Sequence, residues 1–95
     1  MKIKYYVEGT SGKVLVRTSA NEYKYALVNI DEINEGQKGI YCCSGSYENI
    51  MKQYRYWEDI IKHNIKYAEE HGSERLELYK NDLKGLKIVE LVKGC

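Results

Sequence analysis

The chain has 95 residues, of which 43% are hydrophobic and 31% charged, and it contains no proline. This length and composition predict one folded domain over 1–95 and exclude a multidomain enzyme and a disordered, collagen-like or low-complexity chain. Fifteen Lys and Arg residues against fourteen Asp and Glu residues leave a formal net charge of +1. The net charge therefore does not indicate a highly charged partner such as nucleic acid.

The N-terminal residues contain no apolar run of the kind that forms a secretory signal. No other run approaches the roughly 20 apolar residues of a membrane-spanning helix. We therefore expect a cytoplasmic protein without a membrane partner. The three cysteines are Cys42, Cys43 and the last residue, Cys95. An odd number with two neighbours in sequence is unusual for structural disulfides, so we expect reduced thiols. The sequence leaves open whether any of them is reactive.

The first part of the chain alternates between apolar and polar residues, which is typical of half-buried strands. Ile3, Tyr5 and Val7 share one face of a strand over 2–7. A glycine-containing turn follows at 8–12, and a second apolar run occupies 13–18. The pattern predicts a hairpin with a loop of about five residues.

Three further strands are predicted from residues that favour extended structure. They cover 23–30, 40–43 and 86–92. Between the first two of these strands, 31–39 is polar and acidic and ends at a glycine. We expect 31–39 to be a surface loop and the most mobile segment of the chain.

Apolar residues then recur at helical spacing over a long stretch. Ser46 is the predicted N-cap and Gly72 the predicted end of this helix. Ser73 is the predicted cap of a second, shorter helix that ends at Asp82 or Leu83, and the alternative is that this segment continues the long helix. The apolar positions of the long helix, called the core stripe below, are Ile50, Tyr54, Trp57, Ile61, Ile65 and Ala68. The order of elements predicts an α+β domain, in which an antiparallel sheet of four to five strands carries one long amphipathic helix, with the short second helix, on one face.

Familiar catalytic and metal-binding patterns do not account for this sequence. The glycines in 9–13 have two residues between them, whereas a phosphate-binding loop has four, so this segment predicts a hairpin turn. His63 and His71 stand eight residues apart on the predicted helix, which separates them by about 12 Å, too far for one metal ion. We expect a protein that is not an enzyme and that carries no metal and no cofactor.

Tyrosine is the main aromatic residue, with ten Tyr, one Trp and no Phe. Exposed tyrosine beside arginine is typical of protein–protein contact sites, and it also occurs where single-stranded nucleic acid or a nucleotide stacks. Both interpretations stay open. The sequence also has an acidic group in 31–35, which contrasts with the Lys and Arg residues of the predicted binding surface. A surface with charges of both signs favours a specific protein partner over a long polyanion. The predicted partner-binding residues are Tyr6, Arg17, Tyr47, Lys52, Arg55 and Tyr56.

In size, single-domain build and usage of Tyr, Lys and Ile, the chain resembles small accessory proteins of bacterial viruses and mobile elements, including inhibitors of host defence such as anti-CRISPR proteins. This resemblance covers no aligned motif and implies no site residue. It implies a phage-encoded, non-enzymatic protein in the host cytoplasm that inhibits a defence component, such as a CRISPR effector, by protein–protein binding. The expected partner is a larger host protein or complex, and the chain is also a candidate homo-oligomer. The alternatives are an oligomeric sponge for a nucleotide signal and a nucleic-acid-binding accessory protein.

Overall fold

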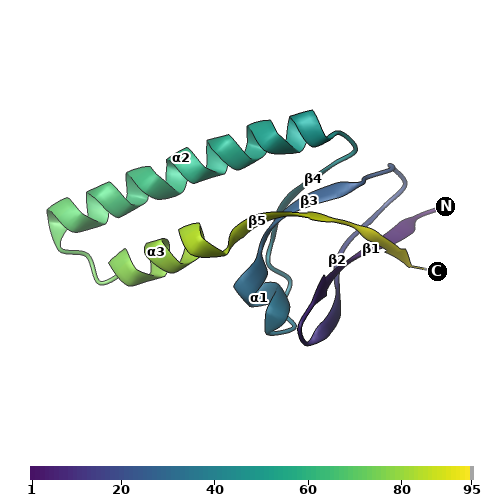
Figure 1. The fold of residues 1–95 in the computed structure, drawn as a ribbon, viewed down its shortest axis with the longest axis horizontal. Helices are drawn as coiled ribbons and strands as arrows, with labels where there is room; N and C mark the ends of the chain where they lie inside the picture. The colour runs from purple at the N-terminus through teal and green to yellow at the C-terminus, as the bar shows by residue number, and fades with distance from the viewer. Residues whose placement is uncertain (95) are drawn as a thin grey trace.

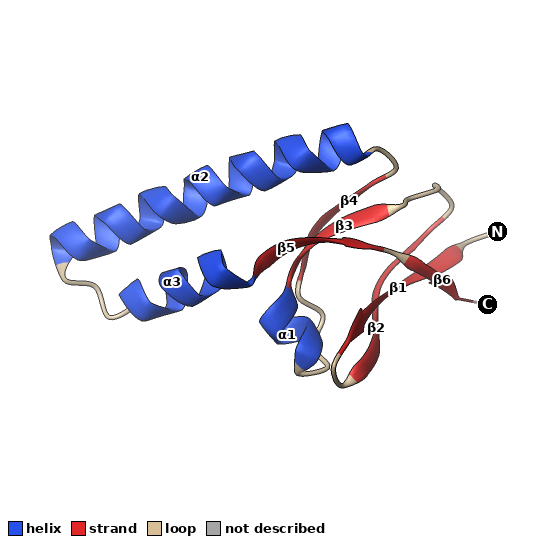
Figure 2. Ribbon diagram, in the orientation of Figure 1, coloured by secondary structure: helices blue, strands red, loops and turns tan. Residues whose placement is uncertain are grey.

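The computed structural model describes residues 1–94, whose path is drawn in Figure 1. The strands gather at one end of the molecule, together with both chain termini, and two helices project from the other end (Figure 2). This is the predicted α+β class, with antiparallel strands and one long helix. In chain order the elements are β1 (Ile3–Gly9), β2 (Gly12–Ser19), β3 (Tyr25–Asn29), α1 (Ile30–Asn34), β4 (Ile40–Ser44), α2 (Tyr47–His71), α3 (Leu76–Gly85), β5 (Leu86–Glu90) and β6 (Val92–Gly94).

The six strands form two three-stranded antiparallel sheets instead of the predicted single sheet of four to five strands. The strand orders are β2-β1-β6 and β4-β3-β5. The difference arises at Leu91, which interrupts the strand expected over 86–92. On one side of Leu91, β5 pairs with β3, and on the other side β6 pairs with β1. The Leu91 N–H donates to the Lys24 carbonyl at 2.9 Å between the two pairings. One continuous segment therefore links the two sheets.

The first hairpin is tighter than the sequence predicted. Gly9 of β1 pairs with Gly12 of β2, so the loop contains only Thr10 and Ser11. Gly12 adopts a φ of 113°, a conformation that glycine reaches without steric cost. The predicted face of β1 is confirmed by Tyr5, which is completely buried.

Two hydrophobic cores lie on the two faces of β3. Ala26 and Val28 belong to a cluster that includes Val7 and other residues of the first hairpin. Leu27 points the other way and belongs to a second cluster with Ile50 of α2. Because successive side chains of a strand alternate between its faces, Ala26, Leu27 and Val28 are all fully buried only where both faces are covered.

The prediction of a surface loop over 31–39 is wrong at its start, where the short helix α1 forms. Ile33 of this helix is completely buried in the first core cluster. The side-chain oxygen of Asn29 accepts hydrogen bonds from the N–H groups of Asp31 at 3.1 Å and Glu32 at 3.3 Å. The cap and one apolar anchor hold a helix that is too short and too polar to show a helical period in the sequence.

The long helix α2 agrees with its prediction at both ends. The Ser46 hydroxyl accepts from the Asn49 N–H at 3.4 Å, and Gly72 ends the helix with a φ of 62°. The shorter helix α3 begins at Leu76 and not directly after Ser73. In Figure 1, α3 runs back beneath the C-terminal half of α2, so the two form a helical hairpin that extends beyond the sheets.

Candidate functional site

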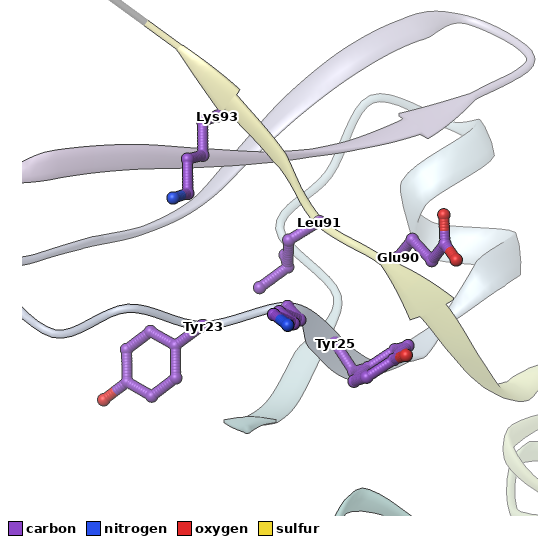
Figure 3. Close-up of a pocket in the computed structure, with 6 residues that line it drawn as sticks. Tyr23, Tyr25, Glu90, Leu91 and Lys93 are labelled. Atoms are coloured by element: carbon purple, nitrogen blue, oxygen red, sulfur yellow. The ribbon is translucent and has the colours of Figure 1, made fainter. Parts of the chain in front are cut away.

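An open groove of about 360 Å³ lies where the C-terminal segment crosses the start of β3 (Figure 3). Figure 3 shows Leu91 projecting toward the stretch between Tyr23 and Tyr25, whose rings lie on either side. We call this site the aromatic groove. Its lining residues are Tyr23, Lys24, Tyr25, Glu90, Leu91 and Lys93.

The hydrogen bonding at the sheet crossing fixes the walls of the groove. Lys24 donates its N–H to the Ser44 carbonyl at 3.0 Å and accepts from the Leu91 N–H at 2.9 Å. The backbone at Lys24 is therefore tied to β4 through its N–H and to the segment that carries Leu91 through its carbonyl. Side chains at the groove start from a rigid frame, which lowers the entropy lost when a partner binds.

Arg17 and Tyr47, two of the six predicted binding residues, extend the aromatic groove at its two ends. The Arg17 guanidinium lies 5.5 Å from the centre of the Tyr23 ring, within the range of a cation–π contact. The Tyr47 ring meets the Tyr25 ring edge to face, with their centres 5.4 Å apart. The structure thus brings Arg17 and Tyr47 to one continuous surface, although they are far apart in the sequence.

A bulge in β2 explains why Arg17 reaches Tyr23. Tyr5 pairs with Arg17 and Tyr6 pairs with Leu15, so Val16 is an additional residue in β2. Bulges redirect side chains, and here Arg17 lies opposite Tyr5, whose ring meets the Tyr23 ring edge to face at 5.6 Å. The prediction had placed Arg17 on the polar side of a regular strand.

The buried Tyr5 hydroxyl holds the segment that carries Tyr23. It donates to the Asn21 carbonyl at 2.7 Å and accepts from the Tyr23 N–H at 3.0 Å. The Asn21 amide also donates to the Tyr23 hydroxyl at 3.5 Å. Hydrogen bonding from Asn21, and next from Arg17, lowers the pKa of Tyr23. The Tyr23 hydroxyl is consequently a better hydrogen-bond donor than that of an unperturbed tyrosine.

Charges of both signs surround the aromatic groove. Lys24, Lys93 and Glu90 all line it, and Lys93 also lies 3.7 Å from Glu22. Because both side chains of that ion pair are more than half exposed, the pair adds little to stability and can exchange partners. The site can therefore seat an apolar side chain and at the same time offer lysines to a carboxylate.

The other four predicted binding residues lie elsewhere. Tyr6 is half-buried, on the face of β1 opposite Tyr5, and packs against Gly94. Lys52 lies beside the outer edge of β4, near Cys42. Arg55 and Tyr56 are exposed on α2, and the Tyr56 ring contacts Trp57 edge to face at 5.9 Å. The six predicted residues thus do not form one site.

Sequence reasoning did not single out Tyr23, Tyr25 and Lys93, which line the aromatic groove. Tyr23 and Tyr25 fell within a predicted strand over 23–30, where alternating tyrosines indicate only a sheet face. The strand instead begins at Tyr25, and Lys93 arrives from the far end of the chain. The only signal in the sequence is the Tyr-Lys-Tyr run beside a turn.

The cysteines and histidines, which are the candidate nucleophiles and metal ligands, lie on different elements. Cys42 and Cys43 are half-buried on β4, and burial raises the pKa of both thiols. His63 and His71 are exposed on α2. Within residues 1–94, no three His, Cys, Asp or Glu side chains are grouped to hold a metal ion. The question of a reactive Cys95 falls outside the described residues.

A second depression, of about 560 Å³, carries the acidic group predicted in 31–35. Asp31, Glu32 and Glu35 of the α1 region meet Asp82 of α3 there. The Asn29 amide donates to Asp82 at 3.4 Å, and burial raises the pKa of the Asp82 carboxyl. The surface therefore has an acidic region separate from the mixed charges of the aromatic groove.

No protein-family model, curated protein or solved structure matches this chain. Among the helices of residues 1–94, none combines the length and the apolar character needed to cross a membrane. Functional inference therefore rests on the geometry of the chain itself.

Proposed function

We propose that the chain is a non-enzymatic binding protein, and that the aromatic groove, with Arg17 and Tyr47 at its ends, contacts a larger protein. One observation carries the proposal: six aromatic or cationic side chains from four separate elements and a loop converge on one surface. Tyrosine and arginine contribute most to protein–protein contacts because they bury large areas and retain hydrogen-bonding groups.

The chemistry of the aromatic groove favours a particular kind of protein segment. Tyr23, Tyr25 and Leu91 offer an apolar seat, and Lys24 and Lys93 stand beside it. A segment with an aromatic or branched apolar residue next to an Asp or Glu residue satisfies both features. Such charge pairing raises the association rate and selects the partner more than it adds affinity.

Two carboxylates weigh against a phosphate-rich ligand at this site. Glu90 lines the aromatic groove, and Glu22 pairs with Lys93. A nucleotide or a nucleic-acid strand would bring further negative charge beside them, which costs binding energy. The nucleotide-sponge and nucleic-acid alternatives are therefore less well supported than protein binding.

The biological role belongs to the same proposal. Inhibition of a host defence component, such as a CRISPR effector, by a phage-encoded protein in the host cytoplasm is supported by the resemblance in size and composition to small viral accessory proteins. A protein that binds tightly through one rigid surface can block a larger partner without catalysis.

The test compares two double variants as baits in a host lysate. Arg17→Glu with Tyr47→Ala alters the aromatic groove, and Arg55→Glu with Tyr56→Ala makes the matched change on α2. Tyr47 is 56% exposed and Tyr56 is 58% exposed, so both pairs should fold. We expect wild type and the α2 pair to retain a stoichiometric protein that the groove pair loses.

Other outcomes contradict the proposal at different points. Loss of the retained protein with the α2 pair alone would assign binding to α2. Absence of any retained protein would contradict a protein-binding role. A small bound mass in native mass spectrometry of the purified protein would favour the nucleotide sponge, and binding that weakens steeply with salt would favour nucleic acid.

A further inference from the structure

A second row of side chains runs along α2 outside the core stripe. Tyr56, Ile60, His63 and Tyr67 follow one another at intervals of four, three and four residues. We call them the outer row. This spacing is that of the seam between two packed helices. Tyr56 and Tyr67 are each 58% exposed, and the four side chains lie outside both core clusters of residues 1–94.

The outer row points well away from the sheets. With 3.6 residues per turn, it lies roughly 130° around α2 from the core stripe. Its two tyrosines are already supported by neighbours on the helix. The Tyr67 ring stacks on the His71 ring with their centres 4.0 Å apart, and the Tyr56 ring rests against Trp57. Rings held in this way lose little conformational entropy when a second surface covers them.

The charges beside the outer row are complementary to those of an antiparallel second copy. Consider a twofold axis midway between Ile60 and His63. Tyr56 then faces Tyr67 of the second copy, and Ile60 faces His63 of the second copy. Asp59 and Lys66 each precede an outer-row residue, Ile60 and Tyr67, on the same flank of the helix. In an antiparallel helix pair, the residues on this flank of one helix meet the residues on the same flank of the other helix. Asp59 of each copy therefore faces Lys66 of the other copy, which gives two ion pairs related by the twofold axis.

A parallel arrangement fits poorly. It would place Glu70 against Glu70 of the second copy in the seam. Like charges at directly opposed positions are destabilising. The charge pattern therefore selects the antiparallel arrangement.

We propose that the outer row is the interface of an antiparallel homodimer, in which α2 packs against α2 of a second copy between two Asp59–Lys66 ion pairs. A contact between single helices is small for a protein–protein interface, so the dimer is weak and forms with rising concentration. The aromatic groove takes no part in this contact, so the result of either test does not decide the other proposal.

Sedimentation equilibrium over concentrations up to about 1 mM tests the dimer, since weak association is measurable in that range. We expect wild type to dimerise and Ile60→Glu and Tyr67→Glu to stay monomeric. Arg55→Glu places a glutamate on another face of α2, with a larger change of charge than the two interface variants, and should dimerise like wild type. Circular dichroism of each variant separates loss of folding from loss of pairing. A wild-type monomer throughout would overturn the proposal.

A charge exchange tests the antiparallel arrangement. Asp59→Lys puts two lysines opposite each other at both ends of the contact, and we expect the dissociation constant to rise about tenfold. Adding Lys66→Asp to the same chain reverses both ion pairs and should restore wild-type affinity. An unchanged dissociation constant in Asp59→Lys, or a failure of the added Lys66→Asp to restore wild-type affinity, would overturn this pairing.

Discussion

Replacement of Tyr5 by Phe tests whether one buried hydroxyl holds the aromatic groove. The Tyr5 side chain is completely buried, and its oxygen makes hydrogen bonds of 2.7 Å to the Asn21 carbonyl and 3.0 Å from the Tyr23 N–H. Each such bond contributes about 1 kcal/mol net, so Tyr5→Phe should lower the free energy of unfolding by about 2 kcal/mol. For a domain of this size the melting temperature should fall by roughly 8 to 16 °C.

The single tryptophan provides the assay. Trp57 packs against Tyr41, with ring centres 5.0 Å apart, so its fluorescence reports the α2 core in urea unfolding. We expect a lower midpoint with an unchanged slope, because the folded and unfolded surfaces stay nearly the same. Hydrogen exchange should also accelerate at the Tyr23 amide, which loses its acceptor.

Tyr6→Phe is the matched control for this prediction. It removes the same hydroxyl from the neighbouring residue of β1, and within residues 1–94 the Tyr6 hydroxyl makes no hydrogen bond to a side chain or backbone group. Its effect should stay within about 0.5 kcal/mol. Equal destabilisation by the two substitutions would refute the assignment of a special role to the Tyr5 hydroxyl.

Three further predictions concern packing, pH and thiol reactivity. A methyl group at Gly85 would approach the Asn29 side-chain oxygen to 2.6 Å, so Gly85→Ala should cost about 1 to 3 kcal/mol in urea unfolding, and a neutral effect would contradict the close approach. Because burial raises the folded-state pKa of Asp82 above its ordinary value of 3.8, wild type should lose stability as pH rises from that value through the raised pKa. Asp82→Asn should abolish this loss, and identical pH profiles for the two proteins would exclude it. In a Cys95→Ser background, burial and the raised thiol pKa values should make Cys42 and Cys43 react more slowly with a disulfide reagent when folded than in urea; equal rates would show that neither thiol is protected.

The local sequence was sufficient to predict α2. The core stripe, the Ser46 cap and the left-handed Gly72 depend on residues within a few positions of one another, so the chain specifies this helix without reference to its partners. The buried face of β1 was predictable for the same reason, because alternation is a local property.

Tertiary structure alone decided the sheets and the aromatic groove. Which strands pair depends on contacts between distant residues, and the interruption at Leu91 joins β5 to one sheet and β6 to the other. Helix α1 forms because Ile33 finds a core to enter, which its polar neighbours do not reveal. Tyr23 and Tyr25 become walls of one groove only when Leu91 and Lys93 arrive from the opposite end of the chain. Periodicity encodes which side of an element is apolar, whereas the identity of the neighbour across that side is a non-local property of the whole fold.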